Sequence, residues 1–143
     1  MRIPLYVIFA LAVAAITGCS TVNPGHLYGD VRVHDLKTAY VVKHSNSTRD
    51  VDIYVQEALS DHGIKAQVGP IESKPKDVDF YIEYVDHWRW DMAMYLFSLD
   101  IRFERNSDGA LLGTGSFRQG FLHSFPDTRA KTHEVVDQIF MAH

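Results

Sequence analysis

Eight histidines and one cysteine are the side chains of this 143-residue chain that would most readily bind a metal ion. Their spacing does not favour a metal site, because the sequence holds no His-x-His, His-x-x-His or His-Glu-x-x-His pattern and Cys19 is the only thiol. We therefore expect surface and loop histidines, no metal and no other cofactor.

The patterns that would indicate catalysis are also missing. The serine of "GTGSFRQG", Ser116, lacks the Gly-x-Ser-x-Gly elbow of a hydrolase, and "GALLGTG" lacks the lysine of a phosphate-binding loop. Glycines in such a strand more often allow close packing or a bulge. Asp86 and Asp91 lie on opposite parities of one strand, so they are no obvious acid–base couple. We predict that the protein is not an enzyme.

The segment "DHWRWDMAMYLF", residues 86–97, holds the densest cluster of binding-type side chains. In a strand, a row of Trp88, Trp90, Met92 and Met94 would share one face, since side chains alternate. Two interpretations stay open. In the first, the row fills the core beneath the two helices, and Asp91 accepts hydrogen bonds from an indole N–H or from backbone donors at the corner.

In the second interpretation the row is exposed and binds a partner, because methionine and tryptophan suit both protein and lipid-headgroup interfaces. The contact surface would then consist of Trp88, Arg89, Trp90 and Met92, with Tyr95 as support.

The first nineteen residues have the layout of an export signal. One positive charge, Arg2, precedes an apolar run from Ile3 to Ile16, which is short for a membrane-spanning helix. The run ends in "ITGC", which resembles the bacterial lipobox. The resemblance implies cleavage between Gly18 and Cys19 and diacylation of the Cys19 thiol.

The cysteine count and the next residue fit this prediction. A lone cysteine excludes a disulfide within the chain, and thioether formation would consume the free thiol. Ser20 follows, and by resemblance to the enterobacterial sorting rule a residue other than aspartate there implies the outer membrane. We expect a signal peptide over residues 1–18, a lipidated tether over 19–35 and one domain over 36–143.

The remaining sequence predicts an ordinary globular domain. Hydrophobic residues make up 46% of the chain and charged residues 22%, with a net charge of -4, which makes nucleic acid an unsuitable partner. Hydrophobic periodicity and turn residues predict strands over 38–44 and 64–70, a helix from a cap at Ser47 to His62, a hairpin with its corner near 90–94, a strand over 110–120 and a helix beginning at 126–128. This order favours an α+β two-layer sandwich, with two helices on one face of a largely antiparallel sheet of four or five strands (β-α-β-β-β-β-α).

Residues Thr38–Phe140 resemble a family of small uncharacterised Gram-negative lipoproteins. The resemblance lies in "YVVKH", in a Trp-x-Trp-Asp-x-x-x-Tyr pattern at Trp88, Trp90, Asp91 and Tyr95, in "GALLGTGSFR" and in "VVDQIF". The element order is more loosely similar to the amino-terminal domain of the Tol-system propeller protein and to the curli-secretion lipoprotein.

Together these features predict a non-catalytic lipoprotein that faces the periplasm from the outer membrane and binds or scaffolds an envelope component. The alternative is a carrier that holds a small apolar or lipid ligand between sheet and helices. A closed cavity under the helices would favour the carrier, and an exposed apolar patch would favour the binding module.

Overall fold

A six-stranded mixed sheet and two α-helices form the domain in the computed structural model, which describes residues 21–30, 32–45, 49–120 and 125–142. The strands are β1 Thr21–Leu27, β2 Thr38–Lys43, β3 Lys65–Pro70, β4 Phe80–Asp91, β5 Ala93–Arg105 and β6 Leu111–Arg118. The helices are α2 Val51–Asp61 and α3 Thr128–Met141, with 3-10 turns η1 Val33–Asp35 and η2 Ile71–Ser73. The strand order in the sheet is β1-β6-β5-β4-β2-β3.

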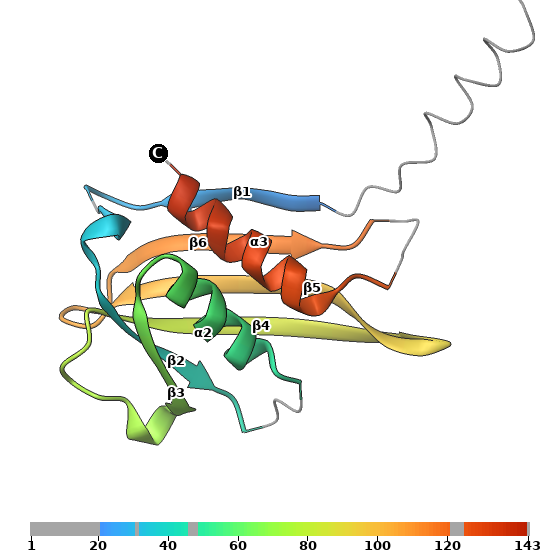
Figure 1. The fold of residues 1–143 in the computed structure, drawn as a ribbon, viewed down its shortest axis with the longest axis horizontal. Helices are drawn as coiled ribbons and strands as arrows, with labels where there is room; N and C mark the ends of the chain where they lie inside the picture. Colours follow the sequence, from blue (N-terminus) through green and yellow to red (C-terminus); the bar gives the residue numbers. More distant parts are fainter. Residues whose placement is uncertain (1–20, 31, 46–48, 121–124, 143) are drawn as a thin grey trace, which may run out of the picture.

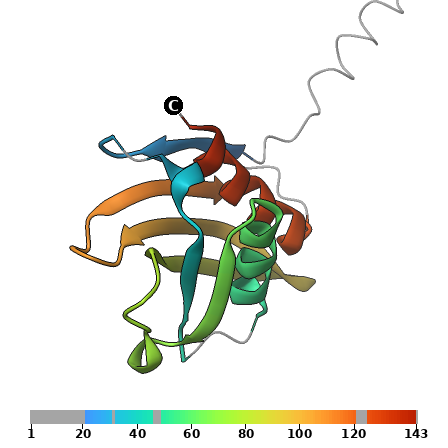
Figure 2. The same ribbon diagram turned by 60° about the vertical axis from the view of Figure 1, so that its left-hand side comes forward.

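Both helices lie on the same face of the sheet, and no described helix covers the other face (Figures 1 and 2). The interior between the two layers is filled by large side chains from β4, β5 and both helices. Those exposed by 1% or less include Phe80, Ile82, Tyr84, Leu99, Ile101, Phe103, Val55, Leu59, Val135 and Ile139. The predicted α+β class with two helices is thus confirmed.

The sheet differs from the expected one in its strand directions. Strand β2 pairs in parallel with both β3 and β4, whereas β4, β5, β6 and β1 pair antiparallel. A parallel pair needs a crossover connection, and α2 provides it between β2 and β3. Gly63, with φ +76°, follows α2 and begins the return to β3.

The sixth strand is β1, in the segment that the sequence predicted to be a tether over residues 19–35. Thr21–Leu27 pairs with β6 at the edge of the sheet, and the register shifts between Asn23 and His26. Pro24 and Gly25 lie in this shift, where a residue without a ladder hydrogen bond is tolerated. The sequence did not predict this strand, because proline and glycine are typical of loops.

Glycines in β6 allow α3 to approach the sheet closely. A β-carbon on Gly113 would lie 2.8 Å from the Ile139 side chain, and one on Gly115 would lie 2.8 Å from the Val135 carbonyl oxygen. The predicted close packing of this glycine-containing strand is confirmed.

The observed helix starts can be compared with the predicted ones for α3 but not fully for α2. Asp127 caps α3 by accepting a hydrogen bond from the Ala130 N–H at 3.1 Å, as the predicted start at 126–128 requires. Asp50 occupies the cap position of α2, and the predicted cap Ser47 lies outside the described residues. Within the described part of the chain, neither helix has the length and apolarity needed to cross a bilayer.

Candidate functional site

The β4–β5 hairpin extends well beyond the rest of the sheet (Figure 1). The two strands pair from Phe80–Arg105 to Asp91–Ala93, whereas the pairing of β6 with β5 ends at Arg118–Ser98. We call residues 88–96 the hairpin tip. The tip contains all five residues that the sequence analysis assigned to a contact surface.

The chain reverses at Met92, which lies between the paired residues Asp91 and Ala93 and has φ 58°. This position confirms the predicted corner within 90–94 without glycine or proline. The register of the hairpin shifts at a different place, after His87. His87 pairs with Ser98, whereas the next residue, Trp88, pairs with Leu96. Phe97 is therefore an extra residue in β5, and the bulge allows both Leu96 and Leu99 to be buried.

Trp88 belongs partly to the core. It is half-buried, packs against the main hydrophobic cluster and donates its indole N–H to Asp86 Oδ2 at 2.6 Å. The guanidinium carbon of Arg49 lies 4.8 Å from the centre of the Trp88 ring. Asp86 rather than Asp91 accepts the Trp88 indole N–H, because side chains two residues apart in a strand share a face and Asp86 lies on that of Trp88.

The outer part of the row is exposed. The exposed fractions of Trp90, Met92 and Met94 are 72%, 90% and 38%. Trp90 pairs with Met94 two residues beyond the Trp88–Leu96 pair, so both pairs share one face of the hairpin. The row therefore belongs to the core at Trp88 and to the surface from Trp90 outward. Each of the two sequence interpretations holds for only part of the row.

Arg89 and Tyr95 form the next pair, on the opposite face of the hairpin. The Arg89 guanidinium lies 3.5 Å from the centre of the Phe97 ring, and Arg89 is exposed. Tyr95 is only 6% exposed and packs edge-on against Phe125 with ring centres 5.7 Å apart. Tyr95 thus supports the hairpin from within rather than offering its ring to a partner.

Two residues near the tip, Arg49 and Phe125, were missed by the sequence analysis. Arg49 precedes α2, and Phe125, which is 56% exposed, precedes α3. Only the fold brings them to the hairpin, and no local pattern marks them. Gly18 and Cys19, the predicted cleavage and lipidation residues, lie outside the described residues.

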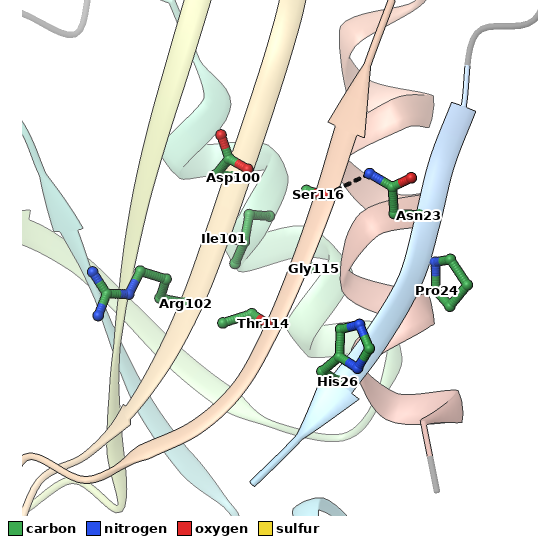
Figure 3. Close-up of a pocket in the computed structure, with 9 residues that line it drawn as sticks. All are labelled: Asn23, Pro24, His26, Asp100, Ile101, Arg102, Thr114, Gly115 and Ser116. Carbon is green, nitrogen blue, oxygen red and sulfur yellow. Dashed lines mark hydrogen bonds between the residues drawn. The ribbon is translucent and has the colours of Figure 1, made fainter.

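A second candidate region is a polar hollow of about 540 Å³ on the face of the sheet opposite the helices (Figure 3). Strands β1, β5 and β6 line it with Asn23, Pro24, His26, Asp100, Ile101, Arg102, Thr114, Gly115 and Ser116. Asn23 Nδ2 donates to Ser116 Oγ at 2.8 Å across its floor. Such a hydrogen bond is typical of a solvated sheet face. Among the residues that line the hollow, Ser116 is bonded to an amide and not to a base.

Two further hollows, of about 450 and 260 Å³, lie along the outer side of α3 and beside the end of β2. None of these three hollows lies between the helices and the sheet. Among the described residues they offer no closed apolar cavity of the kind that a ligand carrier needs.

Two histidines between α2 and α3 lie against carboxylates of the neighbouring helix. His62 Nε2 lies 2.7 Å from Asp137 Oδ1, and His133 Nδ1 lies 3.3 Å from Asp61 Oδ2. The His62 ring also stacks on Phe140 with centres 4.0 Å apart. In the part of the chain that the structure describes, no three metal-binding side chains converge.

Two groups in or beside β2, Tyr40 and Asp79, have shifted pKa values, and each shift has a cause in the fold. Burial, and then the charge of Glu72, raises the pKa of Tyr40, whose hydroxyl donates to the Pro70 carbonyl at 2.9 Å. The hydrogen bond from the Lys37 backbone N–H is the largest cause of the lowered pKa of Asp79, and bonds from Thr38 lower it further. Both groups tie β2 to its neighbours, far along the sheet from the hairpin tip, and neither lines the polar hollow.

Comparison with known proteins gives the fold. No protein-family model and no curated protein matches the chain. The solved structures that resemble it include two PelC dodecamers from Paraburkholderia phytofirmans, one of them a leucine-to-methionine variant. The variant has a TM-score of 0.58 and 14% identity over 89% of this chain and 100% of that chain, and the other form has 0.54 and 12% over 89% and 99%.

A PDZ domain protein from Parabacteroides distasonis is also similar, with a TM-score of 0.55 and 14% identity. The match covers 92% of this chain and 38% of that protein. At these identities the likeness concerns the fold alone.

Proposed function

We propose that the chain is a non-catalytic lipoprotein of the outer membrane, held by acyl chains on Cys19, whose hairpin binds a component of the cell envelope. The observation that carries the proposal is the hairpin tip. Trp90 and Met92 lie at the end of a strand pair that leaves the sheet, and most of the surface of both side chains is exposed. Exposed apolar side chains gathered in this way mark contact surfaces.

The proposed anchor rests on the sequence of residues 1–19 and on the resemblance to small Gram-negative lipoproteins. Two or three acyl chains hold a protein on a bilayer almost permanently, since each buried methylene contributes about 0.8 kcal/mol. The contact residues are Trp90, Met92 and Arg89, with Trp88 and Tyr95 holding the strands beneath them. The PelC structures, which share this fold, are dodecamers, so a second copy of the chain is one component that the hairpin can bind.

The test is photo-crosslinking in intact cells from a reactive amino acid that replaces Trp90. The control carries the same group in place of Asp108, in the exposed turn between β5 and β6 at the far end of the sheet. We expect a discrete protein or lipid adduct from position 90 and none from position 108. Equal labelling from both positions, or none from either, would contradict a contact role for the hairpin.

A further inference from the structure

We propose that the hairpin tip enters the headgroup layer of the bilayer that holds the acyl chains, so that the protein touches the membrane at two points. The proposal deepens the proposed function and rests on the lipid anchor at Cys19. In this proposal the exposed side chains of Trp90, Met92 and Met94 contact lipid rather than a protein partner.

The register of the sheet places the start of β1 and the hairpin tip at the same end of the domain. Thr21 pairs with Arg118, Arg118 pairs with Ser98, and Ser98 pairs with His87, so these four residues stand at one level across the sheet. From this level the hairpin continues outward to Met92. Figure 1 shows both features at its right-hand side, the beginning of β1 above and the tip of β4 and β5 below.

The length of chain before β1 then limits how far the domain can stand from the bilayer. Cys19 is two positions ahead of Thr21, and two residues span at most about 7 Å. From His87 to Asp91, the partners of Ser98 and Ala93, the hairpin extends about 13 Å at the rise of a β-strand. The hairpin therefore extends farther beyond the start of β1 than the two-residue connection can separate that end of the domain from the bilayer.

The lateral distance is also short. Strands β1 and β5 are separated by β6 alone, which places the hairpin about 10 Å from β1 in the plane of the sheet. Because the headgroup layer is only about 5 to 8 Å thick on each side, a domain held this closely brings the tip into it, either end-on or lying along the surface.

The side chains at this end suit a lipid interface. The amphipathic ring of tryptophan is enriched at the headgroup level, and methionine is apolar and adaptable. The exposed guanidinium groups of Arg49, Arg89 and Arg118 surround the base of the hairpin and can bind lipid phosphates. Of the carboxylates here, Asp86 accepts the Trp88 indole N–H, and Asp91 adjoins the corner.

Met92 provides the second structural argument. A left-handed φ of 58° favours glycine, yet this position carries a methionine that is 90% exposed. The side chain makes the turn less stable and packs against little of its own domain. A contact outside the domain accounts for it.

The experiment uses the full acylated chain, reconstituted into vesicles of phosphatidylethanolamine and phosphatidylglycerol with brominated acyl chains. The chain has two tryptophans, so Trp88→Phe leaves Trp90 as the sole reporter. We expect a blue-shifted Trp90 emission in ordinary vesicles and a loss of its intensity in brominated ones. The same chain with Met92→Gly should show less quenching.

A matched control carries Trp88→Phe, Trp90→Phe and Asp108→Trp, which moves the reporter to the opposite end of the sheet on the same anchor. It should show neither the shift nor the quenching. Flotation and the mass of each sample confirm that it is acylated.

Acylated protein that floats with the vesicles while Trp90 emission is unshifted and unquenched would overturn the proposal and leave the anchor intact. Crosslinking from position 90 to a second copy or another protein, without quenching, would overturn it in favour of a protein contact. A chain that carries no acyl group would contradict the proposed function, and the membrane contact with it.

Discussion

At the scale of single residues, the corner of the hairpin combines an unfavourable backbone conformation with an exposed apolar side chain. Met92 has φ 58°, which costs a residue with a β-carbon about 1 kcal/mol relative to glycine. Its exposed side chain recovers little of this cost within the domain.

Met92→Gly should therefore raise the free energy of unfolding by about 1 kcal/mol. The measurement is urea denaturation of the non-acylated chain. Met94→Gly is the matched control and should lower the stability, because glycine in a regular strand loses more entropy on folding. A destabilised Met92→Gly variant would show that the methionine packs within the domain.

A second residue-scale prediction concerns Asp79, which joins the starts of β2 and β4. Asp79 Oδ2 accepts hydrogen bonds from the backbone N–H groups of Lys37 at 2.7 Å and Thr38 at 2.9 Å, and these lower its pKa. The stabilisation is complete above the ordinary aspartate pKa, near 4, and is lost as the pH falls through the lower folded value.

Asp79→Asn should cost about 1 kcal/mol at pH 7, since Asp79 is exposed and solvent screens its charge. In urea denaturation the difference between this variant and the natural chain should shrink at pH 3. A difference of equal size at both pH values would mean that the negative charge contributes nothing.

Tryptophans 88 and 90 show what residue patterns can and cannot predict. Alternation correctly indicated that both tryptophans share one face of a strand. It could not indicate where the core ends along that face, because this depends on where the helices and neighbouring strands stop. Arg49 and Phe125 reach the hairpin only through the fold.

At the scale of elements, the contact between α3 and the sheet depends on small residues in β6. A β-carbon on Gly115 would lie 2.8 Å from the Val135 carbonyl oxygen and 2.9 Å from the Ile139 side chain. The carbonyl oxygen is part of the helix backbone, so it cannot give way without a shift of α3.

Gly115→Ala should accordingly destabilise the domain by about 1 to 3 kcal/mol, the usual range for overpacking. Thr114→Val, one residue earlier on the uncovered face, is the control and should change the stability by no more than about 0.5 kcal/mol. Thermal unfolding followed by circular dichroism compares them. Equal stability of the Gly115→Ala variant and the natural chain would mean that α3 can shift at no cost.

The sequence predicted β2, α2, β3, the hairpin, β6 and α3 to within a few residues, because each has clear periodicity or turn residues at its ends. It missed β1, where Pro24 and Gly25 hide an edge strand, and it missed the parallel pairing of β2. Strand direction depends on contacts between distant segments, which local periodicity does not report. The position of the bulge at Phe97 depends on such contacts as well, and the sequence did not predict it.

At the scale of the whole molecule, the fold combines a polar open sheet face with a group of exposed apolar side chains at the hairpin tip, Trp90, Met92 and Met94. The hairpin tip projects from the end at which β1 begins (Figures 1 and 2). Under the proposed lipid anchor at Cys19, the two-residue connection to Thr21 would keep this end of the domain within about 7 Å of the bilayer.

Removing the anchor should change the location of the chain, whereas changing the tip should not. In cell fractionation we expect Cys19→Ala to retain residues 1–18 and to carry no lipid. We expect Trp90→Gln to remain in the outer-membrane fraction, since acyl chains alone suffice for stable attachment. Release of the Trp90→Gln variant into the soluble fraction would mean that the hairpin provides the attachment itself.

The most direct test of the central claim is the intact mass of the mature protein extracted from bacterial membranes. We predict a chain that begins at Cys19 and carries the mass of a diacylglycerol group plus one further acyl chain. A mass that corresponds to an unmodified Cys19 thiol, or to a chain that still begins at Met1, would contradict the claim.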